Sequence, residues 1–119
     1  MSRTATTWQP EFIFGIGDNF YQWGVTSVTD RMWINTFENV YSSNELQCDW
    51  HLTTGNHDWE GNTTAQFAYS EMSYRWTYPD YQYLIQSVKS NYIFKGSKGS
   101  NRGFTGSRFK YCRPDFAIM

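Results

Sequence analysis

The 119-residue sequence has few of the residues that define small disulfide-rich or membrane proteins. It contains two cysteines, Cys48 and Cys112, which could form one disulfide but are too few for a disulfide framework. It has two histidines and three prolines. It has no apolar run long enough for a transmembrane helix or for the apolar segment of a signal peptide. We therefore expect no membrane partner. The composition alone does not indicate where in or outside the cell the protein is found.

Charge is distributed unevenly along the chain. Residues 1–86 carry three basic and ten acidic side chains, whereas residues 87–119 carry seven basic side chains and one acidic one. The second stretch includes Lys95-Gly96-Ser97-Lys98-Gly99-Ser100, a linker-like composition. We predict a domain over 1–86 and an irregular, poorly ordered basic tail over 87–119. The aromatic residues in this tail leave open a contact with nucleic acid, but charge runs are more often only solvated, so we expect no such partner.

Three short runs in the first 86 residues have the composition of β-strands. Residues 11–17 and 49–54 are rich in aromatic and β-branched side chains, and each run meets a glycine at its end. A third strand is predicted over 81–88, after Pro79. The first two strands are each followed by a turn with polar side chains.

Two helices are predicted between these strands. Apolar residues follow helical spacing over 29–41, with Thr29 as the expected N-cap. A second helix is expected over 63–76, capped by Asn62 or Thr63. A helical connection usually joins parallel neighbouring strands by a right-handed crossover, so we predict an α/β fold with the order strand, helix, strand, helix, strand.

Oxygen and nitrogen ligands follow the first two strands. Gly17-Asp18-Asn19-Phe20-Tyr21 comes after the first strand, and Gly55-Asn56-His57-Asp58 comes after the second. In open α/β sheets, ligands collect at the carboxyl ends of the strands, where such turns converge. The two turns are therefore expected to face one another across a site.

These residue types suit a site with two metal ions that hydrolyses phosphate esters. Two cations roughly 3.5–4 Å apart can supply a nucleophile and stabilise the developing oxyanions. The Asp18 carboxylate can bridge two ions, and the Tyr21 phenolate favours Fe(III), although its proton, with a pKa of about 10, must be displaced. The neutral amide oxygen of Asn56 suits a divalent ion.

Each of these residues also has a structural interpretation. Asp18 and Asn56 belong to types that favour turns, and Tyr21 taken alone could be a core aromatic residue. His51 lies inside the second strand, so we expect a packed, hydrogen-bonded histidine and not a ligand.

The two motifs resemble those of the purple acid phosphatases, also called tartrate-resistant acid phosphatases, within the calcineurin-like metallophosphoesterases. The resemblance runs from about Pro10 to Tyr83. It implies a hydrolase that cleaves phosphate monoesters through a metal-bound hydroxide at a binuclear centre of Fe(III) and a divalent iron, zinc or manganese ion. It also implies a metallophosphoesterase sandwich of two sheets flanked by helices, of which this chain would hold a portion.

The resemblance also implies roles for individual residues. Asp18 would bridge the two metals, Tyr21 would bind the ferric ion and give a violet colour, and Asn56 would bind the divalent ion and the substrate. His57 would contact the substrate phosphate or protonate the leaving group. Asp58 would orient His57 through a hydrogen bond.

Four of the seven metal ligands that the resemblance implies are missing. The chain has no aspartate before Asp18 and no histidine after His57. We therefore expect a fragment that holds its metals weakly, and an inactive chain is one of the outcomes left open. The alternative is a non-catalytic remnant or binding protein that uses the phosphatase scaffold or the basic tail.

Asn62-Thr63-Thr64 is a candidate glycosylation sequence, which matters only in a secretory route. The family is usually secreted or lysosomal, but this chain shows no apolar leader segment.

Overall fold

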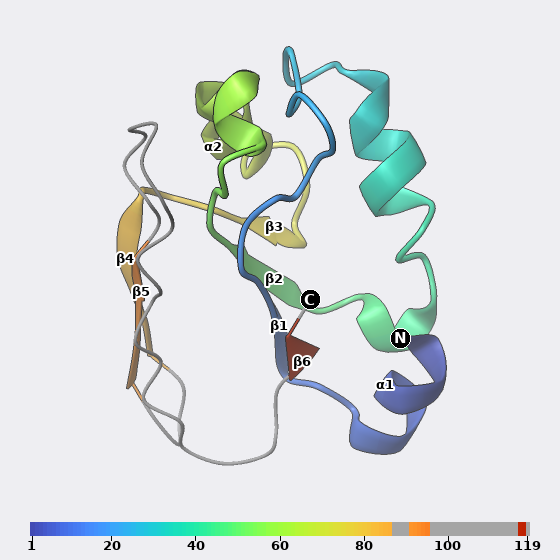
Figure 1. Ribbon diagram of the computed structural model, residues 1–119. Helices are drawn as coiled ribbons and strands as arrows, with labels where there is room; N and C mark the ends of the chain where they lie inside the picture. The colour runs from blue at the N-terminus through green and yellow to red at the C-terminus, as the bar shows by residue number, and fades with distance from the viewer. Residues whose placement is uncertain (87–90, 96–116, 119) are drawn as a thin grey trace.

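The computed structural model describes residues 1–86, 91–95 and 117–118 (Figure 1). These residues form short helices and short strands. In chain order the elements are α1 (Ser2–Trp8), β1 (Phe12–Gly15), the π-helix η1 (Trp33–Glu38), the 3₁₀ helix η2 (Asn44–Leu46), β2 (Asp49–Leu52), the 3₁₀ helix η3 (Asp58–Glu60), α2 (Thr63–Tyr69), β3 (Trp76–Thr77), β4 (Gln82–Gln86), β5 (Asn91–Lys95) and β6 (Ala117–Ile118). No helix in this part of the chain has the length and apolar character needed to cross a membrane.

A parallel sheet forms the centre of the fold. Its strand order is β3-β2-β1-β6, and all three pairings are parallel. Phe12 lies opposite Asp49 and Gly15 opposite Leu52, so the chain leaves β1 and β2 at the same edge of the sheet. Figure 1 shows it leaving both strands in the direction of α2. The predicted α/β class and the first two predicted strands are confirmed.

A separate hairpin packs against this sheet. β4 and β5 pair antiparallel, with Gln82 opposite Lys95 and Gln86 opposite Asn91. β4 confirms the third predicted strand as far as residue 86. β5 and β6 both lie in the tail that we expected to be irregular, so that prediction is wrong for these two segments. The rest of the tail, including Cys112, lies outside the described residues.

The first predicted helix forms, but as a wider turn than expected. Residues 33–38 are a π-helix, in which the Asn39 N–H donates to the Ile34 carbonyl five residues earlier, at 3.0 Å. The expected Thr29 cap is wrong: Met32 is the N-cap residue and makes no side-chain capping hydrogen bond, while just before it Asp30 Oδ1 accepts the Met32 N–H at 3.0 Å. The wider turn leaves Ile34 exposed, although the helical spacing predicted it on the buried face.

The second predicted helix is shorter than expected. α2 begins after Asn62, whose Oδ1 accepts the Ala65 N–H at 3.1 Å, so the predicted cap is confirmed. The helix ends at Tyr69, whereas we predicted that it would continue to Trp76. Trp76 instead pairs with Trp50 as part of β3, because its burial against the sheet outweighs its helical spacing.

Apolar side chains cover both faces of the sheet. Ile13, Trp50 and Leu52 face a large cluster built with the helices and loops. Its aromatic members include Phe20, Trp33, Phe37, Tyr69 and Trp76. Phe12 and Phe14, the neighbours of Ile13 on β1, point to the other face and pack with Ile85 of β4. Successive side chains of β1 therefore point to opposite faces of the sheet, and both faces are covered by apolar residues.

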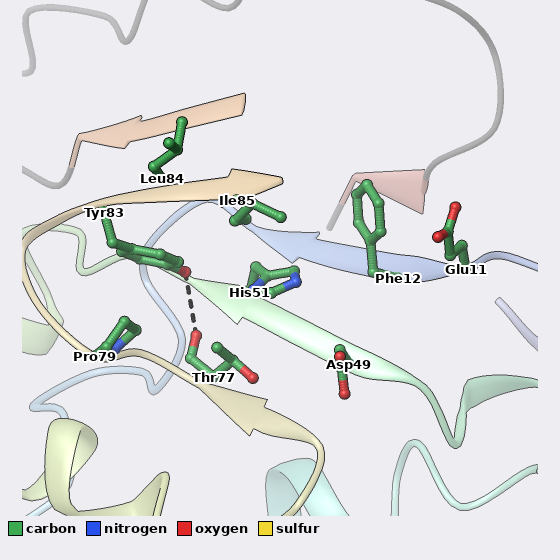
Figure 2. Close-up of a pocket in the computed structure, with 9 residues that line it drawn as sticks. All are labelled: Glu11, Phe12, Asp49, His51, Thr77, Pro79, Tyr83, Leu84 and Ile85. Atoms are coloured by element: carbon green, nitrogen blue, oxygen red, sulfur yellow. Dashed lines mark hydrogen bonds between the residues drawn. The ribbon is translucent and has the colours of Figure 1, made fainter. Parts of the chain in front are cut away.

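His51 lies under the hairpin, in a pocket of about 380 Å³ that opens between β4 and the sheet (Figure 2). Its ring packs at 5.6 Å from that of Phe12 and 6.2 Å from that of Tyr83. The prediction of a packed histidine is confirmed. The predicted hydrogen bond is absent at Nδ1, which is buried without a partner among the described residues. Burial lowers the pKa of His51. The negative charge of Asp49 acts in the opposite direction but does not outweigh it.

An ion pair between buried Arg75 and partly buried Glu38 joins the π-helix to the approach of β3. Arg75 is 2% exposed and donates to Glu38, to the Tyr41 carbonyl and to the Leu46 carbonyl. Glu38 also accepts from Ser73 at 2.8 Å and from Tyr69 at 3.1 Å. Burial alone would raise the pKa of Glu38, but these hydrogen bonds and the Arg75 charge together lower it.

Replacing Arg75 by methionine should destabilise the fold. The change leaves Glu38 partly buried without its cation, a loss of about 3 kcal/mol in the free energy of unfolding. Urea unfolding measures it, with exposed Arg31→Met as the matched control. Equal losses in the two variants would contradict a special role for the Arg75–Glu38 ion pair.

The neutral state of His51 should make stability depend on pH. Because its pKa is lower in the folded chain, the unfolded chain binds more protons, and stability falls as pH drops below about 6.5. His51→Phe keeps an aromatic ring in the same place but cannot bind a proton. It should therefore remove the share of the stability loss at low pH that comes from His51. Unfolding free energies between pH 5 and 7.5 test it, and an unchanged slope in the variant would refute it.

Candidate functional site

The turns after β1 and β2 touch each other through glycine. A Cβ at Gly17 would lie 2.8 Å from the Gly55 nitrogen, and a Cβ at Gly55 would lie 2.2 Å from Asp18 Oδ1. Gly17 also has a φ of 107° and Asp18 a φ of 52°, in the left-handed region. The close approach of the two turns therefore depends on these glycines.

Asp18 connects the two predicted motifs. Its Oδ1 accepts the His57 N–H at 3.1 Å, and its Oδ2 accepts the Tyr21 hydroxyl at 3.0 Å. Tyr21 is 61% exposed, so it is not a core aromatic residue. Its hydrogen bond to Asp18 is the main reason that its pKa is raised, followed by burial and the nearby negative charges.

His57 is held by the first turn. Its Nδ1 lies 2.8 Å from the Gln22 carbonyl. Because a carbonyl oxygen can only accept, Nδ1 carries the proton of this hydrogen bond. The imidazole also packs against the Tyr21 ring, with centroids 4.6 Å apart. The backbone and the aromatic neighbour together orient the histidine.

Asp58 does not orient His57, contrary to our prediction. It is fully buried, and its Oδ2 accepts the backbone N–H groups of Gly55 at 2.8 Å and Asn19 at 3.1 Å. Its Oδ1 accepts the Phe20 N–H at 3.2 Å and Gln66 Nε2 at 2.9 Å. Burial raises its pKa, with the hydrogen bonds acting in the opposite direction. The carboxylate is a clamp that joins the two turns to α2.

Asn19 and Gln66 also belong to the site, although the sequence patterns predicted no role for them. Asn19 Nδ2 donates to the Thr53 carbonyl at 2.8 Å and to Gln66 Oε1 at 3.0 Å. Asn19 lies inside the first motif and Gln66 follows the second, so both residues are near the predicted site residues in the sequence. What the motifs could not show is that the two side chains contact each other and Asp58.

The two asparagine candidates lie on the surface. Asn56 is exposed and precedes His57 on the turn that bonds Asp18. Asn62 is also exposed, and its Nδ2 donates to the Thr26 carbonyl at 3.3 Å.

The chemistry of Asp18 and Tyr21 fits one hard cation. Their oxygens are 3.0 Å apart, and neighbouring ligands of an octahedral ion with bonds of about 2.0–2.1 Å are separated by about 2.9 Å. Within the described residues, no group of three or more histidine, cysteine, aspartate or glutamate side chains is placed to hold a metal. The structure therefore brings together part of a metal site and not a complete one.

These features define an α/β protein with an oxygen-lined site at the carboxyl ends of parallel strands. Comparison with known proteins then gives its relatives. The chain is 42% identical over 86 residues to human tartrate-resistant acid phosphatase type 5, and 47% identical over 76 residues to the rabbit enzyme. It is 40% identical over 58 residues to purple acid phosphatase 3 of Arabidopsis thaliana. The predicted resemblance to the purple acid phosphatase family is confirmed over this part of the chain.

The matches cover unequal shares of the proteins compared. The human alignment includes 71% of this chain but 26% of the relative, and the rabbit alignment 63% and 23%. The Arabidopsis alignment covers 49% and 16%. The chain thus spans about a quarter of the length of the animal relatives. No family model matches it.

A solved structure supports the fold. GAP50, described as the anchor in the inner membrane complex of Plasmodium, matches with a TM-score of 0.53 at 23% identity. The match covers 69% of this chain and 29% of that one.

Replacing Asp58 by asparagine should loosen the site. The amide has the same shape, but its NH₂ group would face backbone N–H donors, so we expect a loss of about 2–4 kcal/mol in the free energy of unfolding. Urea unfolding measures the loss, and Asp49→Asn, at an exposed position, is the matched control. A stability equal to that of the control would exclude the clamp.

Proposed function

We propose that the chain carries part of the catalytic site of a metal-dependent acid phosphatase, a hydrolase of phosphate monoesters. The observation that carries the proposal is the contact of Asp18 with Tyr21 and with the His57 backbone, where two parallel strands end. This contact lies in the stretch that is similar to tartrate-resistant and purple acid phosphatases. The same similarity to enzymes does not favour the non-catalytic alternative.

The metal ligands proposed here are Asp18, Tyr21 and Asn56. Asp18 Oδ2 and Tyr21 Oη would hold Fe(III), and Asp18 with Asn56 would hold a divalent iron, zinc or manganese ion. Such a pair of ions supplies a nucleophile and positive charge for the developing oxyanions. Binding must displace the Tyr21 proton, whose pKa the Asp18 hydrogen bond raises.

In this proposal, His57 is a proton donor or a phosphate contact. Its Nδ1 donates to the Gln22 carbonyl, so Nε2 would give a proton to a leaving oxygen, or donate to the phosphate, from the imidazolium form in which both ring nitrogens are protonated. Asp58 is a positioning residue in this proposal. It acts indirectly, because it fixes the backbone of the two turns that carry Asp18, Tyr21 and His57.

The wider context is also a proposal. The packing of the β4–β5 hairpin on the face of the sheet that bears Phe12 and Phe14 supports the start of a two-sheet metallophosphoesterase sandwich. We propose residues 1–86 as a partial phosphoesterase domain, to which β6 adds a strand. A secretory or lysosomal localisation is supported by the family and by the exposed Asn62 as a glycosylation candidate.

Metal content tests the ligands. Asp18→Asn tolerates the left-handed backbone and retains an acceptor for His57, yet it removes the charge, so both iron and zinc should bind at least about tenfold more weakly. Tyr21→Phe should abolish the violet absorption, and Asn56→Ala should lower zinc more than iron. Asp49→Asn is the control. Equal metal content in all these proteins would refute the assignments.

Activity is a separate measurement. Hydrolysis of an aryl phosphate by the metal-loaded chain should fall in step with metal content across these variants. Hydrolysis that does not follow metal content would count against a metal-dependent mechanism.

A further inference from the structure

Gln66 is a polar residue that α2 places in the interior of the protein. Its exposed fraction is 0%. A buried amide is costly unless its donor and its acceptor both find partners. In Gln66 both do, since Nε2 donates to Asp58 Oδ1 at 2.9 Å and Oε1 accepts Asn19 Nδ2 at 3.0 Å. The two ends of one side chain therefore contact the turn after β2 and the turn after β1.

The direction of these hydrogen bonds follows from Asp58. Both of its carboxylate oxygens accept backbone N–H groups, which can only donate. The carboxylate is therefore matched to the NH₂ end of Gln66, and the carbonyl end is left for Asn19. Asn19 Nδ2 donates to this carbonyl and also to the Thr53 carbonyl at 2.8 Å. The amide of Gln66 thus helps to set the orientation of Asn19.

The backbone that carries Gln66 has contacts of its own. Its carbonyl oxygen accepts the Trp76 indole N–H at 2.9 Å, which joins α2 to β3. The Asn62 cap fixes the start of the same helix. Gln66 therefore reaches the two turns from an element that is itself attached to the sheet. A side chain on a helix or strand positions its neighbours more precisely than one on a loop.

The proposed metal ligands lie next to these contacts in the chain. Asp18 directly precedes Asn19, and Asn56 lies two residues before Asp58. A displacement of Asn19 or Asp58 would therefore change the distance between Asp18 on the first turn and Asn56 on the second. Two catalytic ions lie roughly 3.5–4 Å apart, so ligands from two turns can hold both only at a defined separation.

We propose that Gln66 is a positioning residue for the metal site, which holds the turns after β1 and β2 at the separation that metal binding requires. The inference rests on the proposed function. Gln66 is not itself a ligand, because its amide nitrogen and oxygen are engaged by Asp58 and Asn19. It acts on the metals only through the backbone of the two turns.

Replacing Gln66 by methionine tests the inference, because methionine has a similar length but no amide. The full chain is titrated with iron and with zinc, and far-UV circular dichroism shows whether it is folded. We expect the Gln66→Met chain to bind both metals at least about tenfold more weakly. The violet absorption proposed for Tyr21 and Fe(III) should also shift, because Asp58 Oδ1 holds both Gln66 and the Phe20 N–H.

Two further variants separate positioning from stability. Leu46→Ala also shortens a buried side chain, but Leu46 lies in η2, outside the two turns and α2. It should lower stability and leave the metal affinities and the violet absorption unchanged. Asn19→Ala removes the partner of the Gln66 carbonyl and keeps the contact with Asp58, so it should weaken metal binding as Gln66→Met does. It decides the question if the Gln66→Met chain does not fold.

The outcomes separate the inference from the proposed function. Wild-type metal affinities and violet absorption in Gln66→Met, or in Asn19→Ala, would overturn the role of Gln66 and leave the phosphatase proposal standing. An equal loss of affinity in Gln66→Met and Leu46→Ala would also overturn it, because the loss would then reflect stability alone. A wild-type chain that binds neither iron nor zinc would overturn both.

Discussion

The Asp58 carboxylate is the interaction on which the site depends. A buried charge is costly unless hydrogen bonds compensate it, and here four hydrogen-bond donors do so. Three of these donors are backbone N–H groups from the turns after β1 and β2, and the fourth comes from α2. One side chain thereby holds two separate turns at the distance that lets Asp18 reach both Tyr21 and the His57 backbone.

Two of the four strands of the sheet, β1 and β2, could be predicted because their signals are local. The runs that became β1 and β2 are short and apolar, and each is followed by a turn that contains glycine. The helices were harder to predict. The π-helix adds a residue to each turn, which apolar spacing does not encode, and Trp76 is in a strand because β2 offers it a partner. Tertiary contacts decided both outcomes.

In the site, contacts between side chains of one motif could be predicted, whereas contacts made by the backbone could not. Asp18 and Tyr21, three residues apart, were expected to act together, and they are in contact. The orientation of His57 was assigned to Asp58, yet it comes from the Gln22 carbonyl. Every residue has such a carbonyl, so no residue type marks this role. The burial of Asp58 likewise depends on segments that are far apart in sequence.

The pairing of β1 with β6 has a consequence for synthesis on the ribosome. Phe14 lies opposite Ile118, so β1 is synthesised well before its partner strand, with roughly 100 residues between the two. At about 5–20 residues per second, the roughly 100 intervening residues separate the two by about 5–20 seconds. During that time one edge of β1 is an open template for strands of neighbouring nascent chains. A chaperone that shields this edge would then affect the yield of folded protein more than its final stability.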